Sequence, residues 1–322
     1  MKIVVAMPVT EEHKKWLNAA AGDYPVYFAD NQAAVGVQVP EDVLSDTEII
    51  IGNLDPELVK KAPHLRWMQL NSAGTGAYIK KGVLPEGAVL TNATGAYGLA
   101  LSEHMLAQLL AMMKKLYAYY DNQKQNLWKD EGPVTSVYGA RALVIGFGDI
   151  GSEFGKRLKA LGAHVTGIRR RSTAVPPEAD EMGTMDKLDD YLARADIVAT
   201  SLPDTPATYH LYNKDRFAAM KQGAWFLNIG RGNCVVQEDL IEAVKSGHLA
   251  GAALDVTDPE PLPADDPMWQ VPGIYITPHV SGGYHLKETH DRIVQIACEN
   301  LEAYFYGGKM KNIVDFQTGY KK

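Results

Sequence analysis

The chain has 322 residues, of which 46% are hydrophobic, and this length is enough for two globular domains of ordinary size. A net charge of −7 at pH 7, with no long basic run, argues against nucleic acid as a partner. The apolar run at residues 3–7 is too short for a signal-peptide core or a membrane span, so we expect a cytoplasmic protein without a membrane partner. Cys234 and Cys298 are too few for a disulfide framework and lack metal-site spacing, so we expect both to be structural.

The first 92 residues alternate short apolar runs with polar, amphipathic segments. The segment after Thr10 has acidic residues in its first turn and Gly22 beyond its end, which are signals of a helix. Short apolar runs between helices predict a parallel sheet with helices on its faces. The loop at residues 71–76, NSAGTG, follows one of these strands, where open α/β sheets bind ligands; a flexible glycine turn is the alternative.

Residues 98–120 have helical spacing and are apolar nearly all round, which predicts a buried helix. We expect this helix to join two domains and to contact a second subunit, with an irregular arm at residues 128–138, so the expected assembly is a homodimer. Glu103 and His104 are adjacent but lack the i, i+4 histidine pair of a zinc helix, and we therefore assign no metal.

Residues 142–171 have the pattern of a strand, a glycine-rich turn, a helix and a second strand. Gly146, Gly148 and Gly151 have the spacing that closes a tight turn, lets a pyrophosphate approach the backbone and packs helix against strand. The helix that begins near Asp149 would direct its N–H groups and positive dipole end at a phosphate. Glycine spacing alone is weak evidence, but the flanking strands and helix supply the βαβ unit that a dinucleotide site requires.

Four further apolar runs follow, each ending in a polar or glycine-rich loop, and helical stretches separate them. This pattern predicts a doubly wound sheet. The amphipathic segment at residues 284–306 is expected to cross back to the first domain. We therefore expect an α/β fold of two doubly wound, parallel-sheet, Rossmann-like domains with a cleft between them. The substrate domain would comprise residues 1–98 plus 284–322, and the dinucleotide domain residues 99–283.

Over nearly its full length, the chain resembles the D-isomer-specific 2-hydroxy acid dehydrogenase family. The resemblance is carried by NATGAYGLALSEHMLAQLL (92–110), GFGDIGSEFGKRLKALGAHVTGIRRR (146–171), SLPDTPATYHLYN (201–213), FLNIGRGNCVVQEDLIEAVKSGHLAGAALDVTDPEPLP (226–263) and ITPHVSGG (276–283). It implies that Arg231, Glu260 and His279, each just past a strand end, are the catalytic residues. It also implies that the substrate meets Arg231 and His279, and that its carboxylate meets the backbone N–H groups of Ala73 and Gly74.

Physical chemistry is consistent with these roles. The planar fork of Arg231 can hold the carboxylate and carbonyl of a 2-oxo acid, and its fixed charge polarises the carbonyl. Reduction needs a proton at the carbonyl oxygen, which His279 can supply near neutral pH. A carboxylate at Glu260 favours the protonated imidazole and fixes its orientation. The alternatives are a structural salt bridge for Arg231, a surface acid for Glu260 and a hydrogen-bonded loop histidine for His279.

The same resemblance implies a set of cofactor contacts. Asp255 would bind the nicotinamide carboxamide, and Ile229 and Gly230 would line the ring. The full expected set is Gly146, Gly148, Asp149, Ile150, Gly151, Arg169, Arg170, Arg171, Leu202, Pro203, Thr208, Ile229, Gly230, Asp255 and Gly282.

The end of the second strand of this βαβ unit indicates which nicotinamide cofactor is used. Where an NAD enzyme offers an acid to the adenosine ribose, this chain has Arg169, followed by Arg170 and Arg171. Guanidinium groups can bind a 2'-phosphate by charge-assisted hydrogen bonds, so we expect NADP(H) to be preferred, with NAD(H) as a second possibility. The alternative is that one arginine stacks on adenine and the others face water.

These features predict an oxidoreductase that reduces a small 2-oxo acid, of the glyoxylate or hydroxypyruvate type, to the D-2-hydroxy acid. Thr75 and Gly76 stand where many relatives have a bulkier aliphatic residue and an acid, which leaves the substrate size open. Formate dehydrogenases resemble the chain less, because they have an amide where Glu260 stands. The alternatives are a phosphoglycerate-type dehydrogenase and a dinucleotide-sensing, corepressor-like binding protein; the intact catalytic set weighs against the latter.

Overall fold

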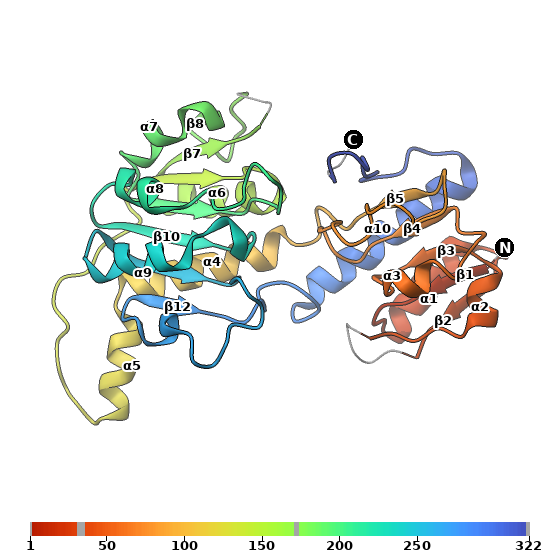
Figure 1. Cartoon of the computed structure of the whole chain (residues 1–322), viewed down its shortest axis with the longest axis horizontal. Helices are drawn as coiled ribbons and strands as arrows, with labels where there is room; N and C mark the ends of the chain where they lie inside the picture. The colour runs from red at the N-terminus through yellow and green to blue at the C-terminus, as the bar shows by residue number, and fades with distance from the viewer. Residues whose placement is uncertain (1, 31–35, 171–173, 320–322) are drawn as a thin grey trace. The chain divides into compact units, whose positions relative to one another are not determined.

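The computed structural model describes residues 2–30, 36–170 and 174–319. The chain forms two compact units, one of residues 1–97 and 283–322 and the other of residues 98–282, and Figure 1 colours it from one terminus to the other. Each boundary lies one residue before the one expected from the sequence. None of the described helices is both long enough and apolar enough to cross a membrane.

A five-stranded parallel sheet forms the first unit, in the order β2-β1-β3-β4-β5 (Figure 1). The strands are β1 (Lys2–Val5), β2 (Val26–Phe28), β3 (Thr47–Ile51), β4 (Trp67–Gln69) and β5 (Val89–Thr91), and the helices are α1 (Glu11–Ala21), α2 (Glu41–Ser45), α3 (Pro56–Val59) and α10 (Lys287–Tyr306). Ile3 and Val5 pack in one core with α1 and α10, whereas Val4 packs in the core on the opposite face. Because both faces are covered, apolar residues point to both sides of strands such as β1.

A seven-stranded parallel sheet forms the second unit, in the order β12-β11-β10-β9-β6-β7-β8. The strands are β6 (Arg141–Ile145), β7 (His164–Ile168), β8 (Glu181–Gly183), β9 (Ile197–Thr200), β10 (Ala224–Asn228), β11 (Leu249–Leu254) and β12 (Ile274–Ile276). The helices are α4 (Gly98–Met113), α5 (Leu116–Lys124), α6 (Asp149–Ala160), α7 (Leu188–Leu192), α8 (Lys214–Ala219) and α9 (Gln237–Lys245). The strand order reverses between β6 and β9, so ligands are expected at the carboxyl ends of these strands.

The two sheets confirm the α/β class predicted from the alternation of apolar runs and helical segments. The pattern did not predict β8, because three residues with one large apolar side chain give no periodic signal.

The single helix predicted over residues 98–120 is wrong: it is interrupted, and α4 and α5 are separate helices. Lys115 has left-handed backbone with φ of 56°, and the N–H of Thr135 in the following arm donates to the carbonyl of Met113 at 3.3 Å. Because Thr135 satisfies the Met113 carbonyl, that carbonyl needs no N–H group from a further helical turn, and the first helix can end here. α4 buries one face, and α5 has no buried residue.

Candidate active site

The glycine-rich turn between β6 and α6 fits a dinucleotide pyrophosphate at each of its glycines. Gly146 has φ of 89°, which favours glycine, and a Cβ there would lie 3.0 Å from Ser201 Oγ. A Cβ on Gly151 would lie 2.4 Å from the carbonyl oxygen of Gly146, so helix and strand approach too closely for any side chain. A Cβ on Gly148 would meet no atom within 4 Å, which leaves this side of the turn open. These features match the three roles of the dinucleotide fingerprint.

The N-terminus of α6 completes this turn. Gly148 is its N-cap and has no side chain to accept from the first N–H groups, which include those of Ile150 and Gly151. The N–H groups at a helix N-terminus and the helix dipole suit an anion. The carboxylate of Asp149 is engaged with another helix. Its Oδ2 accepts from the N–H of Gly98 at 3.1 Å and so caps the start of α4.

Arg169, the first residue after β7, lies beside the same turn. Arg169 Nε donates to the carbonyl of Phe147 at 2.5 Å, and its guanidinium carbon lies 5.7 Å from the centre of the Phe147 ring. This contact holds the Arg169 side chain against the residue between the first two glycines. Arg170 follows it in the chain, and Arg171 lies outside the described residues.

The loops after β9 and β10 pack directly on each other. A Cβ on Gly230 would lie 2.4 Å from the carbonyl oxygen of Leu202, so only glycine permits this approach. Thr208 Oγ1 donates to the carbonyl of Pro203 at 2.7 Å, which closes the first loop and uses the hydroxyl internally. Ile229 is buried behind this contact. The expected contact of Thr208 with a cofactor therefore depends on its methyl group or backbone.

The turn that carries Arg231 is organised by Asn228, which the sequence did not single out, and by Cys234, which was expected to be structural. Asn228 accepts from the N–H of Gly230 at 3.0 Å and donates to the carbonyl of Arg231 at 2.9 Å. The thiol of Cys234 also donates to that carbonyl, at 2.8 Å. Burial raises the pKa of Cys234 to about 11, so the group remains a thiol donor. A polar residue closing the apolar strand β10 was the available signal for Asn228.

The turns after β10 and β11 also meet, and the second one carries Glu260. A Cβ on Gly232 would lie 1.9 Å from the carbonyl oxygen of Thr257, so the turn beside Arg231 contacts this backbone directly. Glu260 Oε1 accepts from the N–H of Thr257 at 3.1 Å, and its Oε2 lies 2.9 Å from His279 Nδ1. The structure thus brings Glu260 and His279 into an ion pair whose two side chains are 39% and 50% exposed.

Asp255 fixes the turn on which His279 stands. Its Oδ1 accepts from Thr277 Oγ1 at 2.6 Å and from the N–H of Val280 at 3.0 Å. Its Oδ2 accepts from both the N–H, at 3.1 Å, and the hydroxyl of Ser281. His279 itself has φ of 50°, an uncommon left-handed conformation for a residue with a side chain. Asp255 was expected to bind a carboxamide, but in the structure its carboxylate holds this turn. Gly282 follows directly after the turn.

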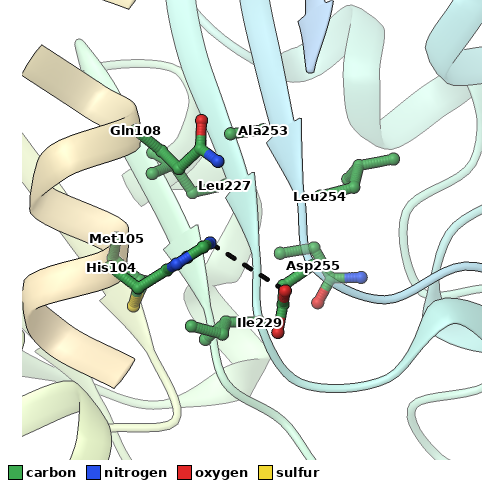
Figure 2. A pocket seen from close by; sticks show the side chains of 9 residues that line it. His104, Met105, Gln108, Leu227, Ile229, Ala253, Leu254 and Asp255 are labelled. Carbon is green, nitrogen blue, oxygen red and sulfur yellow. Dashed lines mark ion pairs between the residues drawn. The ribbon is translucent and has the colours of Figure 1, made fainter. Parts of the chain in front are cut away.

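A small pocket lies between α4 and the carboxyl ends of β10 and β11 (Figure 2). It is lined by His104, Met105, Gln108, Leu227, Asn228, Ile229, Ala253, Leu254 and Asp255. His104 and Asp255 face each other across it, with His104 Nε2 3.9 Å from Asp255 Oδ1. The sequence singled out Ile229 and Asp255 for the cofactor but not the helix side of this pocket.

In the first unit, the loop at residues 72–75 has its carbonyls engaged and its N–H groups free. The carbonyl of Ala73 accepts from Asn92 Nδ2 at 2.8 Å, and that of Gly74 accepts from Ser72 Oγ at 2.7 Å. Within the described part of the chain, the N–H groups of Ala73, Gly74 and Thr75 make no hydrogen bond. Successive free N–H groups form a concavity that suits an anion. Thr75 is buried and donates to the carbonyl of Gly319 at 2.8 Å.

Comparison with known proteins places this architecture in one family. The family profile described as D-isomer specific 2-hydroxyacid dehydrogenase, NAD binding domain, matches residues 106–281. A hydroxypyruvate reductase from Blautia hydrogenotrophica is 29% identical over 289 residues, which cover 85% of this chain and 88% of that protein. Other relatives of similar identity are named D-3-phosphoglycerate dehydrogenase.

Solved structures of members of the same family have a similar fold. A D-isomer specific 2-hydroxyacid dehydrogenase family protein from Aeromonas salmonicida matches with a TM-score of 0.84 and 32% identity, over 98% of this chain and 99% of that one. An NADPH-dependent glyoxylate/hydroxypyruvate reductase from Sinorhizobium meliloti, solved with NADP and sulfate, has a TM-score of 0.83 and 26% identity, with 99% of both chains covered. The present chain belongs to the D-isomer specific 2-hydroxyacid dehydrogenase family.

Proposed function

We propose that this protein reduces a small 2-oxo acid, of the glyoxylate or hydroxypyruvate type, to the D-2-hydroxy acid, with NADPH as the preferred hydride source. The ion pair between His279 Nδ1 and Glu260 Oε2, 2.9 Å apart, carries the proposal. It leaves a half-exposed imidazole with its other nitrogen available for a proton transfer. The relatives named hydroxypyruvate reductase and glyoxylate/hydroxypyruvate reductase support the substrate class.

His279 is assigned as the general acid. Because Nδ1 is engaged with Glu260, the proton leaves from Nε2 and bonds to the carbonyl oxygen, and the neutral imidazole is later reprotonated from water. The negative charge of Glu260 stabilises the imidazolium before transfer. A nicotinamide dinucleotide held by its pyrophosphate at the glycine-rich turn would supply the hydride for this reduction.

Arg231 and the loop at residues 72–75 are assigned to the substrate. A guanidinium can bind a carboxylate by two parallel hydrogen bonds, and the turn built by Asn228 and Cys234 fixes the backbone from which Arg231 extends. For Ala73 and Gly74, the unpaired N–H groups support the proposed contact with the carboxylate. The remaining cofactor contacts, Gly282 among them, stay predictions, as does a cytoplasmic location.

The decisive experiment is oxidation of NADPH or NADH, followed by absorbance at about 340 nm, with a panel of 2-oxo acids. The panel should contain glyoxylate, hydroxypyruvate, pyruvate and phosphohydroxypyruvate. Turnover of glyoxylate and of hydroxypyruvate is expected. Preference for the phosphorylated acid would favour a phosphoglycerate-type enzyme, in line with the relatives of that name. Dinucleotide binding without turnover of any acid would favour a corepressor-like binding protein.

The preference for NADPH is tested at the end of β7. In the double variant Arg169→Asp with Arg170→Ala, we expect the ratio of kcat/KM for NADPH to that for NADH to fall about ten- to a hundredfold. The reason is that each lost charge-assisted hydrogen bond to a 2'-phosphate contributes about 1.5 to 3 kcal/mol. Arg141→Ala, at the amino end of β6, is the matched control and should leave the ratio unchanged. A parent that prefers NADH would refute this assignment.

We also propose that the protein is a homodimer. On α5 and in the arm that follows, Tyr120 is 58%, Tyr138 81% and Trp128 fully exposed. A helix with no buried residue and a run of exposed aromatic side chains need a partner surface. Light scattering at micromolar concentration should give twice the chain mass of 35.3 kDa, and Trp128→Glu should lower it towards one chain. A parent that scatters as a single chain would rule out the dimer.

A further inference from the structure

We propose that His104 is a positioning residue for the general acid. Acting through Thr277 and Asp255, it fixes the turn at residues 277–281 and thereby the orientation of His279. The inference rests on the proposed function, because its kinetic consequence requires His279 to be the proton donor. This positioning role differs from the role considered from the sequence, in which His104 was examined only as a possible metal ligand.

The donor and the acceptor of each hydrogen bond between α4 and the turn can be assigned. Thr277 Oγ1 lies 2.6 Å from Asp255 Oδ1 and 3.1 Å from His104 Nε2. A hydroxyl has one proton, and the carboxylate can only accept, so Thr277 donates to Asp255. Thr277 must then accept from His104, which requires the imidazole proton to be on Nε2. His104 therefore fixes the rotamer of the Thr277 hydroxyl and directs its proton to Asp255.

Thr277 and Asp255 in turn determine the backbone of His279. The N–H of His279 donates to the carbonyls of both residues, at 3.0 Å to Thr277 and 2.8 Å to Asp255. The side-chain carboxylate of Asp255 holds the next two residues, Val280 and Ser281, by their N–H groups. A left-handed residue persists only where its surroundings over-determine it, and these bonds surround His279.

His104 is suited to this role by its position on α4. The start of this helix is capped by Asp149 Oδ2, which accepts from the N–H of Gly98, and its buried face includes Met105, the neighbour of His104. The His104 side chain is 24% exposed and borders the pocket of Figure 2. Because a pocket lies beside it, the imidazole is not simply filling the core, and its hydrogen bond to Thr277 joins this helix to the turn.

Two substitutions separate the hydrogen bond from the bulk of the side chain. His104→Leu removes the donor, whereas His104→Gln places an amide N–H near the position of Nε2. For His104→Leu we expect kcat to fall about three- to thirtyfold, with KM for NADPH within about twofold of the parent, since the general acid is misplaced rather than removed. His104→Gln should recover most of kcat. His164→Leu, which removes an imidazole at the start of β7, is the matched control.

A second measurement does not depend on turnover. In hydrogen–deuterium exchange followed by mass spectrometry, the peptide containing residues 277–281 should exchange about three- to tenfold faster in His104→Leu than in the parent. It should exchange at the parental rate in His104→Gln. The peptide from β6 should be unchanged in both variants, which separates a local effect from a general loss of stability. Unchanged protection of residues 277–281 in His104→Leu would overturn the positioning role, whether or not the parent reduces an oxo acid.

Thr277→Val provides the test from the other end of the hydrogen bond. If His104 acts through Thr277, the double variant with His104→Leu should lose little more kcat than either single variant, because both remove one interaction. Effects that multiply would show that His104 acts by another route and would overturn the proposal. Should His104→Leu fail to fold, Thr277→Val alone must give the faster exchange at residues 277–281. A parent that reduces no oxo acid would refute the proposed function, while the exchange result would still decide the positioning role.

Discussion

His279→Ala is expected to lower kcat by about two to four powers of ten, the usual effect of removing a general acid. The affinity for the cofactor should barely change, because the glycine-rich turn and the arginines after β7 lie on other loops. Near-parental turnover in the variant would mean that another group donates the proton.

Glu260→Gln is the companion variant. The amide keeps the size of the side chain but has one acceptor oxygen, so it can accept either from His279 Nδ1 or from the N–H of Thr257, and the negative charge of the pair is lost. We expect an intermediate loss of kcat, because the imidazolium is no longer stabilised by a charge. His164→Ala removes an imidazole from the amino end of the same sheet and should keep parental kinetics. A loss in Glu260→Gln as large as in His279→Ala would indicate that Glu260 itself takes part in proton transfer.

Arg231→Lys is expected to raise KM for the 2-oxo acid and to lower kcat, with kcat/KM reduced about ten- to a hundredfold. An ammonium keeps the charge but cannot form two parallel hydrogen bonds, and one charge-assisted bond contributes about 1.5 to 3 kcal/mol. KM for NADPH should remain close to that of the parent. Steady-state kinetics with the acid that the parent reduces best will measure both constants.

The control for this variant is Arg141→Lys, which makes the same change at an exposed position at the start of β6. Unchanged oxo-acid kinetics in Arg231→Lys would move the carboxylate site away from Arg231. A change in KM for NADPH of the same size as that for the acid would indicate that the substitution disturbs the packing of the turn at Gly232 instead.

The strands and the glycine-rich turn could be predicted from the sequence because their signals are local. A parallel strand covered on both faces favours a continuous apolar run, and the segment at Arg141–Ile145 supplies one directly before the turn. The spacing of Gly146, Gly148 and Gly151 reflects two close backbone approaches, at Gly146 and Gly151, and one open position, at Gly148, that leaves room for a pyrophosphate. The family resemblance likewise depended on motifs that are contiguous in sequence.

The division into two helices at Lys115 could not be predicted, because the apolar pattern continues through it. The cause is a bond from the arm, in which Thr135 donates to the carbonyl of Met113, and this contact joins residues more than five helical turns apart in the chain. Local helix propensity depends on neighbouring residues and contains no information about such a distant partner. The same limitation applies to β8, whose three residues become a strand only by pairing with β7.

The sequence by itself determined the α/β class, the dinucleotide turn and the types of residue available for acid catalysis, because each depends on neighbours within one βα unit. Only the tertiary structure decided that Glu260 and His279 are 2.9 Å apart and that Asp255 is enclosed by the turn after β12. Only there did His104 become a partner of Thr277, 173 residues further along the chain. The physical reason is that the carboxyl ends of parallel strands meet at one edge of a sheet, and side chains from distant loops then become hydrogen-bond partners that no local pattern encodes.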